Sequence, residues 1–194
     1  IAPEFGELSI AVDLTDVTVV ENQVATFTFE PAGTPIEQLE YQWMLDGALL
    51  EGATGPTLEL PVVLADDGTL VQVVAANASG AFNEIMSAEV TLTVEADTVA
   101  PEIVGAEGTP LNDRLTIAFS EEMSEAGLGE IGNYALMPTE GGEMIPAISA
   151  SPAADGLSVV VIFESPMTAR TRYTLMTENL TDRAATPNGL GDPT

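Results

Sequence analysis

Apolar and polar residues alternate in short runs along the whole chain, which is the period of a β-strand with one buried and one exposed face. The clearest runs lie at residues 24–29, 88–94, 114–119 and 172–176. Residues 159–163 are apolar on both faces, as is typical of an interior strand. These patterns predict an all-β chain.

Residues 94–102 divide this pattern into two halves. One strand pattern ends at Val94, and another begins at Ile103. Between them, Pro101 lacks a backbone donor and favours an extended conformation at Ala100, which indicates a short, stiff linker. Since domains typically contain about 100–150 residues, we predict two, at residues 1–96 and 97–194. The alternative is one large sandwich in which this stretch is a loop.

The first half carries a series of motifs at fixed spacing around the single tryptophan. It resembles the immunoglobulin-like domains of large secreted bacterial proteins in its Tyr41-Gln42-Trp43, Asp46-Gly47, Gly52-Ala53-Thr54, Asp66-Asp67-Gly68-Thr69 and Ala76-Asn77-Ala78-Ser79-Gly80. The resemblance implies a β-sandwich with Trp43 at its centre, packed by Phe29 and Val73, where disulfide-bonded members have cysteines. It also places Val71 where many members have a tyrosine that makes a corner hydrogen bond. A surface platform that stacks on sugars is the alternative role for Trp43.

The second half resembles another family of bacterial immunoglobulin-like domains, which is repeated in surface-layer proteins and secreted enzymes. The resemblance lies in Asp97-Thr98-Val99-Ala100-Pro101, Phe119-Ser120-Glu121, Asn133-Tyr134 and Thr181-Asp182. The turn that follows, residues 184–188, is longer than in that family, and the sequence ends soon afterwards. We therefore expect two tandem immunoglobulin-like β-sandwiches joined by a short linker, the second of which lacks its closing strand.

Charge narrows the set of partners. The chain has 31 acidic and 4 basic residues and a formal net charge of −27. Nucleic acids and anionic lipid surfaces bind clusters of Lys and Arg, so neither is an expected partner. The longest apolar run, residues 159–163, is too short to span a bilayer, so no membrane insertion is expected.

The absence of His, Cys and Lys excludes nucleophile–His pairs and a lysine base. Carboxylate chemistry remains, but glycoside hydrolysis needs two carboxyl groups that face one sugar ring. Adjacent Glu121 and Glu122 would point to opposite faces of a strand. The sequence therefore predicts a protein that is not an enzyme and has no catalytic residue.

Calcium is the one cofactor that the sequence suggests, because this hard cation prefers several carboxylate and carbonyl oxygens. The candidate ligands lie at or near the linker and in two motifs of the second half: Glu95, Asp97, Glu102, Glu121 and Asp182. The alternative is that they are solvated acids at a domain boundary.

The predicted function is a non-catalytic structural spacer or an adhesion and interaction module. It would belong to a larger secreted or surface-attached bacterial protein and would be extracellular or at the cell surface. Its partners would be neighbouring domains of the same chain and a protein or glycan surface ligand. The alternative function is that of a carbohydrate-binding accessory domain of a secreted enzyme, which needs exposed aromatic residues.

Overall fold

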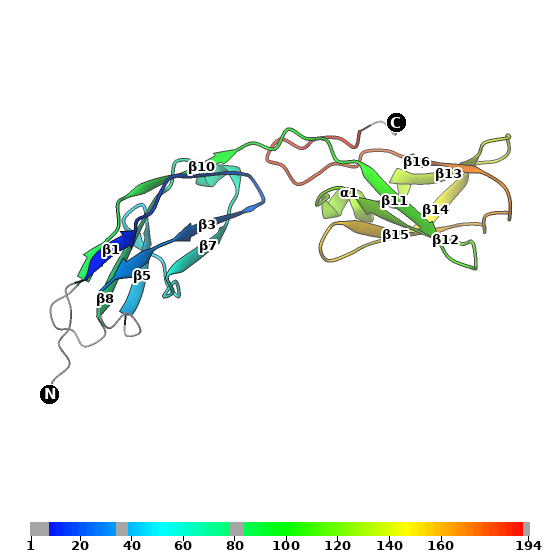
Figure 1. The fold of residues 1–194 in the computed structure, drawn as a ribbon. Coiled ribbons are helices and arrows are strands. Elements are labelled where there is room, and N and C mark those ends of the chain that lie inside the picture. The colour runs from blue at the N-terminus through cyan, green and yellow to red at the C-terminus, as the bar shows by residue number, and fades with distance from the viewer. Residues whose placement is uncertain (1–7, 34–38, 78–83, 192–194) are drawn as a thin grey trace. The chain divides into compact units, whose positions relative to one another are not determined.

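The structure is a computed structural model that describes residues 8–33, 39–77 and 84–191 (Figure 1). It divides into two compact units, Ile1–Asp97 and Thr98–Thr194. Each unit is built from β-strands, as the alternation of apolar residues predicts, and the chain is all-β with two immunoglobulin-like sandwiches. The last residues of the hairpin motif that ends at Gly80 lie outside the described residues.

Among its described residues, the first unit contains ten strands, in two main sheets and one small sheet. One main sheet has the order β2-β10-β8-β5-β6, with β9 also paired to β8; the other pairs β3 with β7, and β1 pairs with β4. The strands are β1 (Ser9–Val12), β2 (Val17–Val20), β3 (Val24–Thr28), β4 (Glu30–Ala32), β5 (Leu39–Leu45), β6 (Ala48–Leu49), β7 (Thr57–Pro61), β8 (Leu70–Asn77), β9 (Glu84–Met86) and β10 (Val90–Glu95).

The core of the first unit forms where the inward faces of these sheets meet. Alternation along β3 buries Ala25 and Phe27, and Phe29 follows on the same face. Trp43 of β5 lies opposite Val73 of β8 in the strand register and has no exposed surface. The indole Nε1 of Trp43 donates a hydrogen bond to the carbonyl oxygen of Gly55 at 2.8 Å, so its one polar atom is satisfied inside the core.

Acidic residues of the first unit's turns bond to its backbone. Asp46 and Gly47 both have positive φ, 50° and 76°, as a two-residue turn between β5 and β6 requires. The Asp46 carboxylate accepts from Leu70 N at 2.9 Å, and Asp66 accepts from Val63 N at 2.8 Å. Asp66 ends the short 3₁₀ helix η2 (Leu64–Asp66). These carboxylates stabilise the turns.

One strand of the first unit differs from its sequence pattern. Ile10 and Val12 alternate as a buried face would, yet they are 40% and 48% exposed. In the part of the chain that the structure describes, the strand β1 pairs with β4 alone, so its apolar side chains lie at the margin of the core and not within it.

Among its described residues, the second unit contains six strands, one short α-helix and one 3₁₀ helix. The strand order is β11-β12-β15-β14-β13-β16, and every pair is antiparallel. The strands are β11 (Ile103–Gly108), β12 (Arg114–Phe119), β13 (Tyr134–Pro138), β14 (Ile145–Pro152), β15 (Ser158–Phe163) and β16 (Tyr173–Thr177), and the helices are α1 (Glu125–Gly129) and the 3₁₀ helix η3 (Ile131–Asn133).

The strand β14 joins two sheets around one core. Its first residues, Ile145 and Pro146, pair with β13, and the rest pair with β15 after an irregularity in register. Inward residues of β12, β13 and β15 then share a single buried cluster. Within it, the Tyr134 hydroxyl donates to the carbonyl oxygen of Leu128 at 2.9 Å, which ties β13 to α1. Burial raises the pKa of Tyr134.

No helix among the described residues is long and apolar enough to cross a membrane.

Candidate functional site

Glu121 lies on the segment that follows β12. Ser120 N donates to the carbonyl oxygen of Glu102 at 2.9 Å, and Glu102 N donates to Ser120 Oγ at 2.9 Å. These two bonds fix the backbone immediately before Glu121. Met123 then forms an isolated bridge with Asp182. The segment that carries Glu121 is thus held against the segment that carries Asp182.

Asp182 is a buried acid, only 2% exposed, that organises the turn after it. Its Oδ1 accepts hydrogen bonds from Ala184 N at 3.1 Å and from Asn188 N at 2.9 Å. Its Oδ2 accepts from Asn188 Nδ2 at 2.8 Å. A buried carboxylate needs such donors, because burial of an unpaired charge is costly. The sequence identifies Asp182 as a possible ligand but not as the centre of this turn, because the residue types alone do not show that Asn188 and Ala184 bond to its carboxylate.

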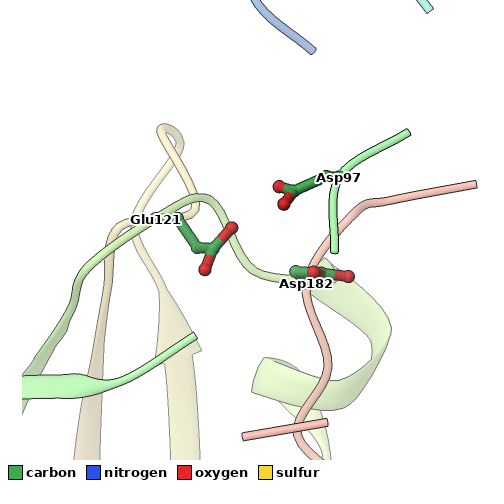
Figure 2. A group of neighbouring side chains, drawn as sticks. All are labelled: Asp97, Glu121 and Asp182. Carbon is green, nitrogen blue, oxygen red and sulfur yellow. The ribbon is translucent and has the colours of Figure 1, made fainter. Parts of the chain in front are cut away.

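Three of the five acids predicted as calcium ligands are neighbours. Asp97, Glu121 and Asp182 each offer a carboxylate oxygen, and these oxygens lie within 4.8 Å of one another (Figure 2). Glu121 and Asp182 belong to the second unit, and Asp97 directly precedes that unit in the chain. Three carboxylates at this spacing match the preference of Ca²⁺ for several hard oxygen ligands.

The other two predicted ligands lie outside this group. Glu95 is the exposed last residue of β10, and its carbonyl oxygen accepts from Glu21 N at 2.9 Å. Glu102 is exposed just before β11, where its backbone bonds to Ser120. Glu21, which the sequence analysis does not single out, is 4% exposed, and its Oε1 accepts from Asp97 N at 3.0 Å.

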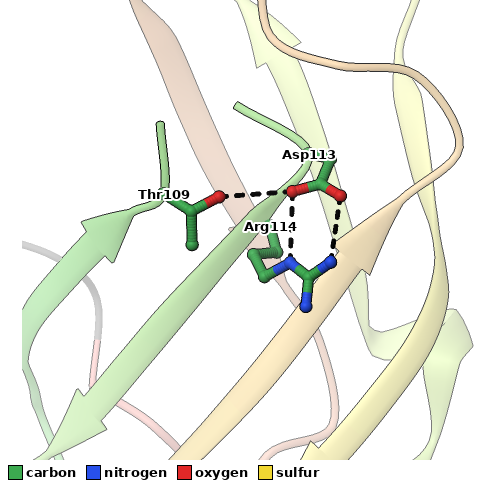
Figure 3. Close-up of polar contacts among 3 residues, drawn as sticks. All are labelled: Thr109, Asp113 and Arg114. Atoms are coloured by element: carbon green, nitrogen blue, oxygen red, sulfur yellow. Dashed lines mark hydrogen bonds and ion pairs between the residues drawn. The ribbon is translucent and has the colours of Figure 1, made fainter. Parts of the chain in front are cut away.

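Two arginines of the second unit pair with acids. Arg114 donates through Nε and Nη2 to the two carboxylate oxygens of Asp113, at 3.1 Å each, and Thr109 Oγ1 donates to Asp113 Oδ1 at 3.2 Å (Figure 3). The hydrogen bonds from Arg114 hold the pKa of Asp113 below its usual range. The pair therefore stabilises the fold fully above the usual carboxyl pKa and loses this effect as the pH falls through the lowered pKa. Arg183 pairs with Glu122. Surface pairs of this kind contribute little to stability.

The aromatic residues do not form an exposed platform in the part of the chain that the structure describes. Trp43 is fully buried, and the half-buried aromatic residues are Tyr41 and Tyr173. The remaining described aromatic side chains are buried in the two cores: Phe27, Phe29, Phe119, Tyr134 and Phe163.

No protein-family model and no curated protein matches this sequence. Solved structures of immunoglobulin domains are similar to this chain, with low TM-scores. Titin domain M7 is 24% identical over 49% of this chain and 100% of its own length, with a TM-score of 0.40. The titin tandem A164-A165 is 12% identical over 90% of this chain and 97% of its own length, with a TM-score of 0.39. The tandem immunoglobulin repeats of Dlar are 18% identical over 95% and 97%, with a TM-score of 0.40.

The strand order of each unit is sufficient to identify its fold, and the similarities to solved structures are not needed for this. In the first unit, the order β2-β10-β8-β5-β6 opposite β3-β7 is that of an immunoglobulin sandwich. In the second unit, the antiparallel strands β11-β12-β15-β14 and β13-β16 are joined through β14 and share one core, as in a sandwich.

Proposed function

We propose that the chain is a non-catalytic structural spacer or adhesion module of a larger secreted or surface-attached bacterial protein. The observation that carries this proposal is that each unit has its own buried core, so each is organised as a separate folded module. The resemblance of both halves to bacterial immunoglobulin-like domains supports the bacterial, extracellular setting. The partners in this role are neighbouring domains and surface ligands.

Binding of carbohydrate is the competing role, and the burial of Trp43 counts against it. Sugar-binding platforms present aromatic faces to solvent, whereas the described aromatic side chains are buried or half-buried. On a glycan array, we expect no signal above that of a variant with Tyr41 and Tyr173 both replaced by serine. Saturable binding of a glycan that this double variant loses would support the accessory-domain role and contradict the spacer role.

We further propose that calcium binds at Asp97, Glu121 and Asp182. The spacing of their carboxylate oxygens supports this role, and so does the rigid placement of Asp182 by its three hydrogen bonds. Glu121 and Asp97 would supply the adjustable ligands, because both are half-buried. Carbonyl oxygens or water would complete the six to eight oxygens that Ca²⁺ takes.

Millimolar calcium is expected to raise the melting temperature of the second unit, because a ligand that binds only the folded state stabilises it. Magnesium should act less, since it demands octahedral geometry and loses water reluctantly. Scanning calorimetry and calcium titration calorimetry measure both effects. The variants Asp97→Asn and Glu121→Gln should lose the calcium response. Glu95→Gln, an acid of the same linker outside the cluster, is the matched control and should keep it. An unchanged melting temperature and no binding heat would refute the calcium proposal.

A further inference from the structure

The strand β16 is at one end of the second unit's strand order. On one side it pairs with β13 along its whole length, from Tyr173 opposite Pro138 to Thr177 opposite Tyr134. On its other side, no strand pairs with it among residues 8–33, 39–77 and 84–191. An edge of this kind presents backbone donors and acceptors to whatever strand approaches it.

The register shows which backbone groups face the open side. Glu178 N donates to the carbonyl oxygen of Asn133 at 3.1 Å, and Thr139 N donates to that of Arg172 at 3.0 Å. Residues alternate in direction along a strand, so the backbone groups of Thr174 and Met176 also point to β13. The N–H and C=O groups of Tyr173, Leu175 and Thr177 therefore point to the open edge.

In the first unit, the strand that corresponds to β16 is β8, and β8 has a neighbouring strand on each side. There, β8 pairs with β5 on one side and with β9 and β10 on the other. The inward residues of β8 have no exposed surface: Val71, Val73 and Ala75. In the second unit, Tyr173 and Leu175 of β16 remain half-buried although both pack against the core. On the neighbouring strand β13, Tyr134 and Leu136 are 2% and 1% exposed.

We propose that the open edge of β16 binds an extended strand from another polypeptide, with apolar residues at alternate positions. The strand β10 shows the chemistry that fits, because its buried Val90, Leu92 and Val94 alternate with threonines and it lies antiparallel to β8. In that geometry, inward residues also bond to the neighbouring strand, as Leu92 N does to the carbonyl oxygen of Thr69 at 2.9 Å. The added strand would cover Tyr173 and Leu175 and bond to the open backbone groups.

The charge of the chain favours a different polypeptide over a second copy. Two copies would each carry a formal net charge of −27, and like charges of this size oppose self-association. A neutral or basic strand meets no such barrier. This inference goes beyond the spacer role, since a chain that binds no strand at β16 would still act as a spacer.

The probe for this site is a nine-residue peptide with the sequence of residues 88–96, in which lysine replaces both glutamates. Titrated into the intact protein, it should bind and protect the amides of Tyr173, Leu175 and Thr177 from hydrogen exchange. N-methylation of the peptide at its valine and leucine positions should weaken binding at least about tenfold, because these amides face β16. N-methylation at its threonine positions should weaken it less than about twofold, because those amides face solvent. The proposal would be overturned if N-methylation at the two sets of positions weakened peptide binding equally. It would also be overturned if the peptide protected amides elsewhere in the protein from hydrogen exchange.

A variant of the protein tests the same edge from the other side. Thr177→Pro removes an N–H that faces the open side and breaks no bond to β13, a position where an edge strand tolerates proline. It should weaken peptide binding at least about tenfold, while Thr177→Ala should not. If Thr177→Pro does not fold, the N-methylated peptides decide the question alone. Concentration-dependent dimers in which Tyr173, Leu175 and Thr177 are protected without peptide would overturn the choice of partner in favour of a second copy.

Discussion

Replacement of Trp43 by alanine is expected to lower the unfolding free energy of the first unit by about 3–5 kcal/mol, the usual cost of removing a large buried aromatic side chain. Trp43 has no exposed surface and belongs to the main core cluster. Alanine in its place would leave a cavity in the core cluster that contains Phe29 and Val73, and an unpaired carbonyl at Gly55. Since whole domains are stable by only about 5–15 kcal/mol, the first unit would be close to unfolding.

Calorimetry is the appropriate measurement, because the variant removes the only tryptophan and with it the fluorescence signal. The melting transition of the second unit should stay where it is. Leu49→Ala is the control, since Leu49 is 68% exposed on β6 and should cost little. A loss below about 1 kcal/mol for Trp43→Ala would mean that Trp43 does not support the core.

Replacement of Asp182 by alanine is expected to destabilise the second unit by about 2–4 kcal/mol, because several donors lose a charged acceptor at a buried position. Ala184 N, Asn188 N and Asn188 Nδ2 all bond to this carboxylate. The turn that they form also bonds back to Asp182, whose N–H donates to the carbonyl oxygen of Asn188 at 3.1 Å. Loss of the carboxylate should therefore loosen residues 182–190.

Denaturant melts of the second unit and hydrogen exchange at residues 184 and 188 measure this effect. Glu178→Ala is the control, because Glu178 is an exposed acid a short distance before Asp182. Should Asp182→Ala melt like the control, the carboxylate would contribute no net stability to the turn. That result would leave calcium binding as the reason for an acid at this position.

Most of the strands could be predicted because their apolar residues obey the two-residue period of a sheet. The pattern at Ala25, Phe27 and Phe29 matches three buried positions. The run that ends in Phe163 is an interior strand, as its two apolar faces predict, and β15 lies between β12 and β14. Asp46-Gly47 makes the turn that its residue types favour.

Other elements depend on contacts between distant residues and left no clear signal in the sequence. The strand β14 contains two prolines and four small residues, Ala147, Ser149, Ala150 and Ser151, so its alternation is weak. The helix α1 contains Gly127 and Gly129, which disfavour helices. It is held instead by burial of Leu128 and by the bond from Asn133 Nδ2 to the carbonyl oxygen of Gly127 at 2.9 Å.

The grouping of Asp97, Glu121 and Asp182 also depends on contacts between residues that are distant in the chain. The sequence predicts five candidate ligands but does not predict which of them lie close together. The bridge between Met123 and Asp182 joins segments that lie far apart in the chain. It brings Glu121 to Asp182, while Glu95 and Glu102 lie outside the group.

Single-molecule unfolding of the intact chain under force tests the central claim, that two separately folded sandwiches act as a spacer, most directly. Each unit has its own core, so we expect two unfolding events, each releasing about 330 Å of chain at an extended length of about 3.4 Å per residue. Trp43→Ala should lower the force of one event and leave the other unchanged. A single event that releases about 660 Å would show one cooperative structure and contradict the account.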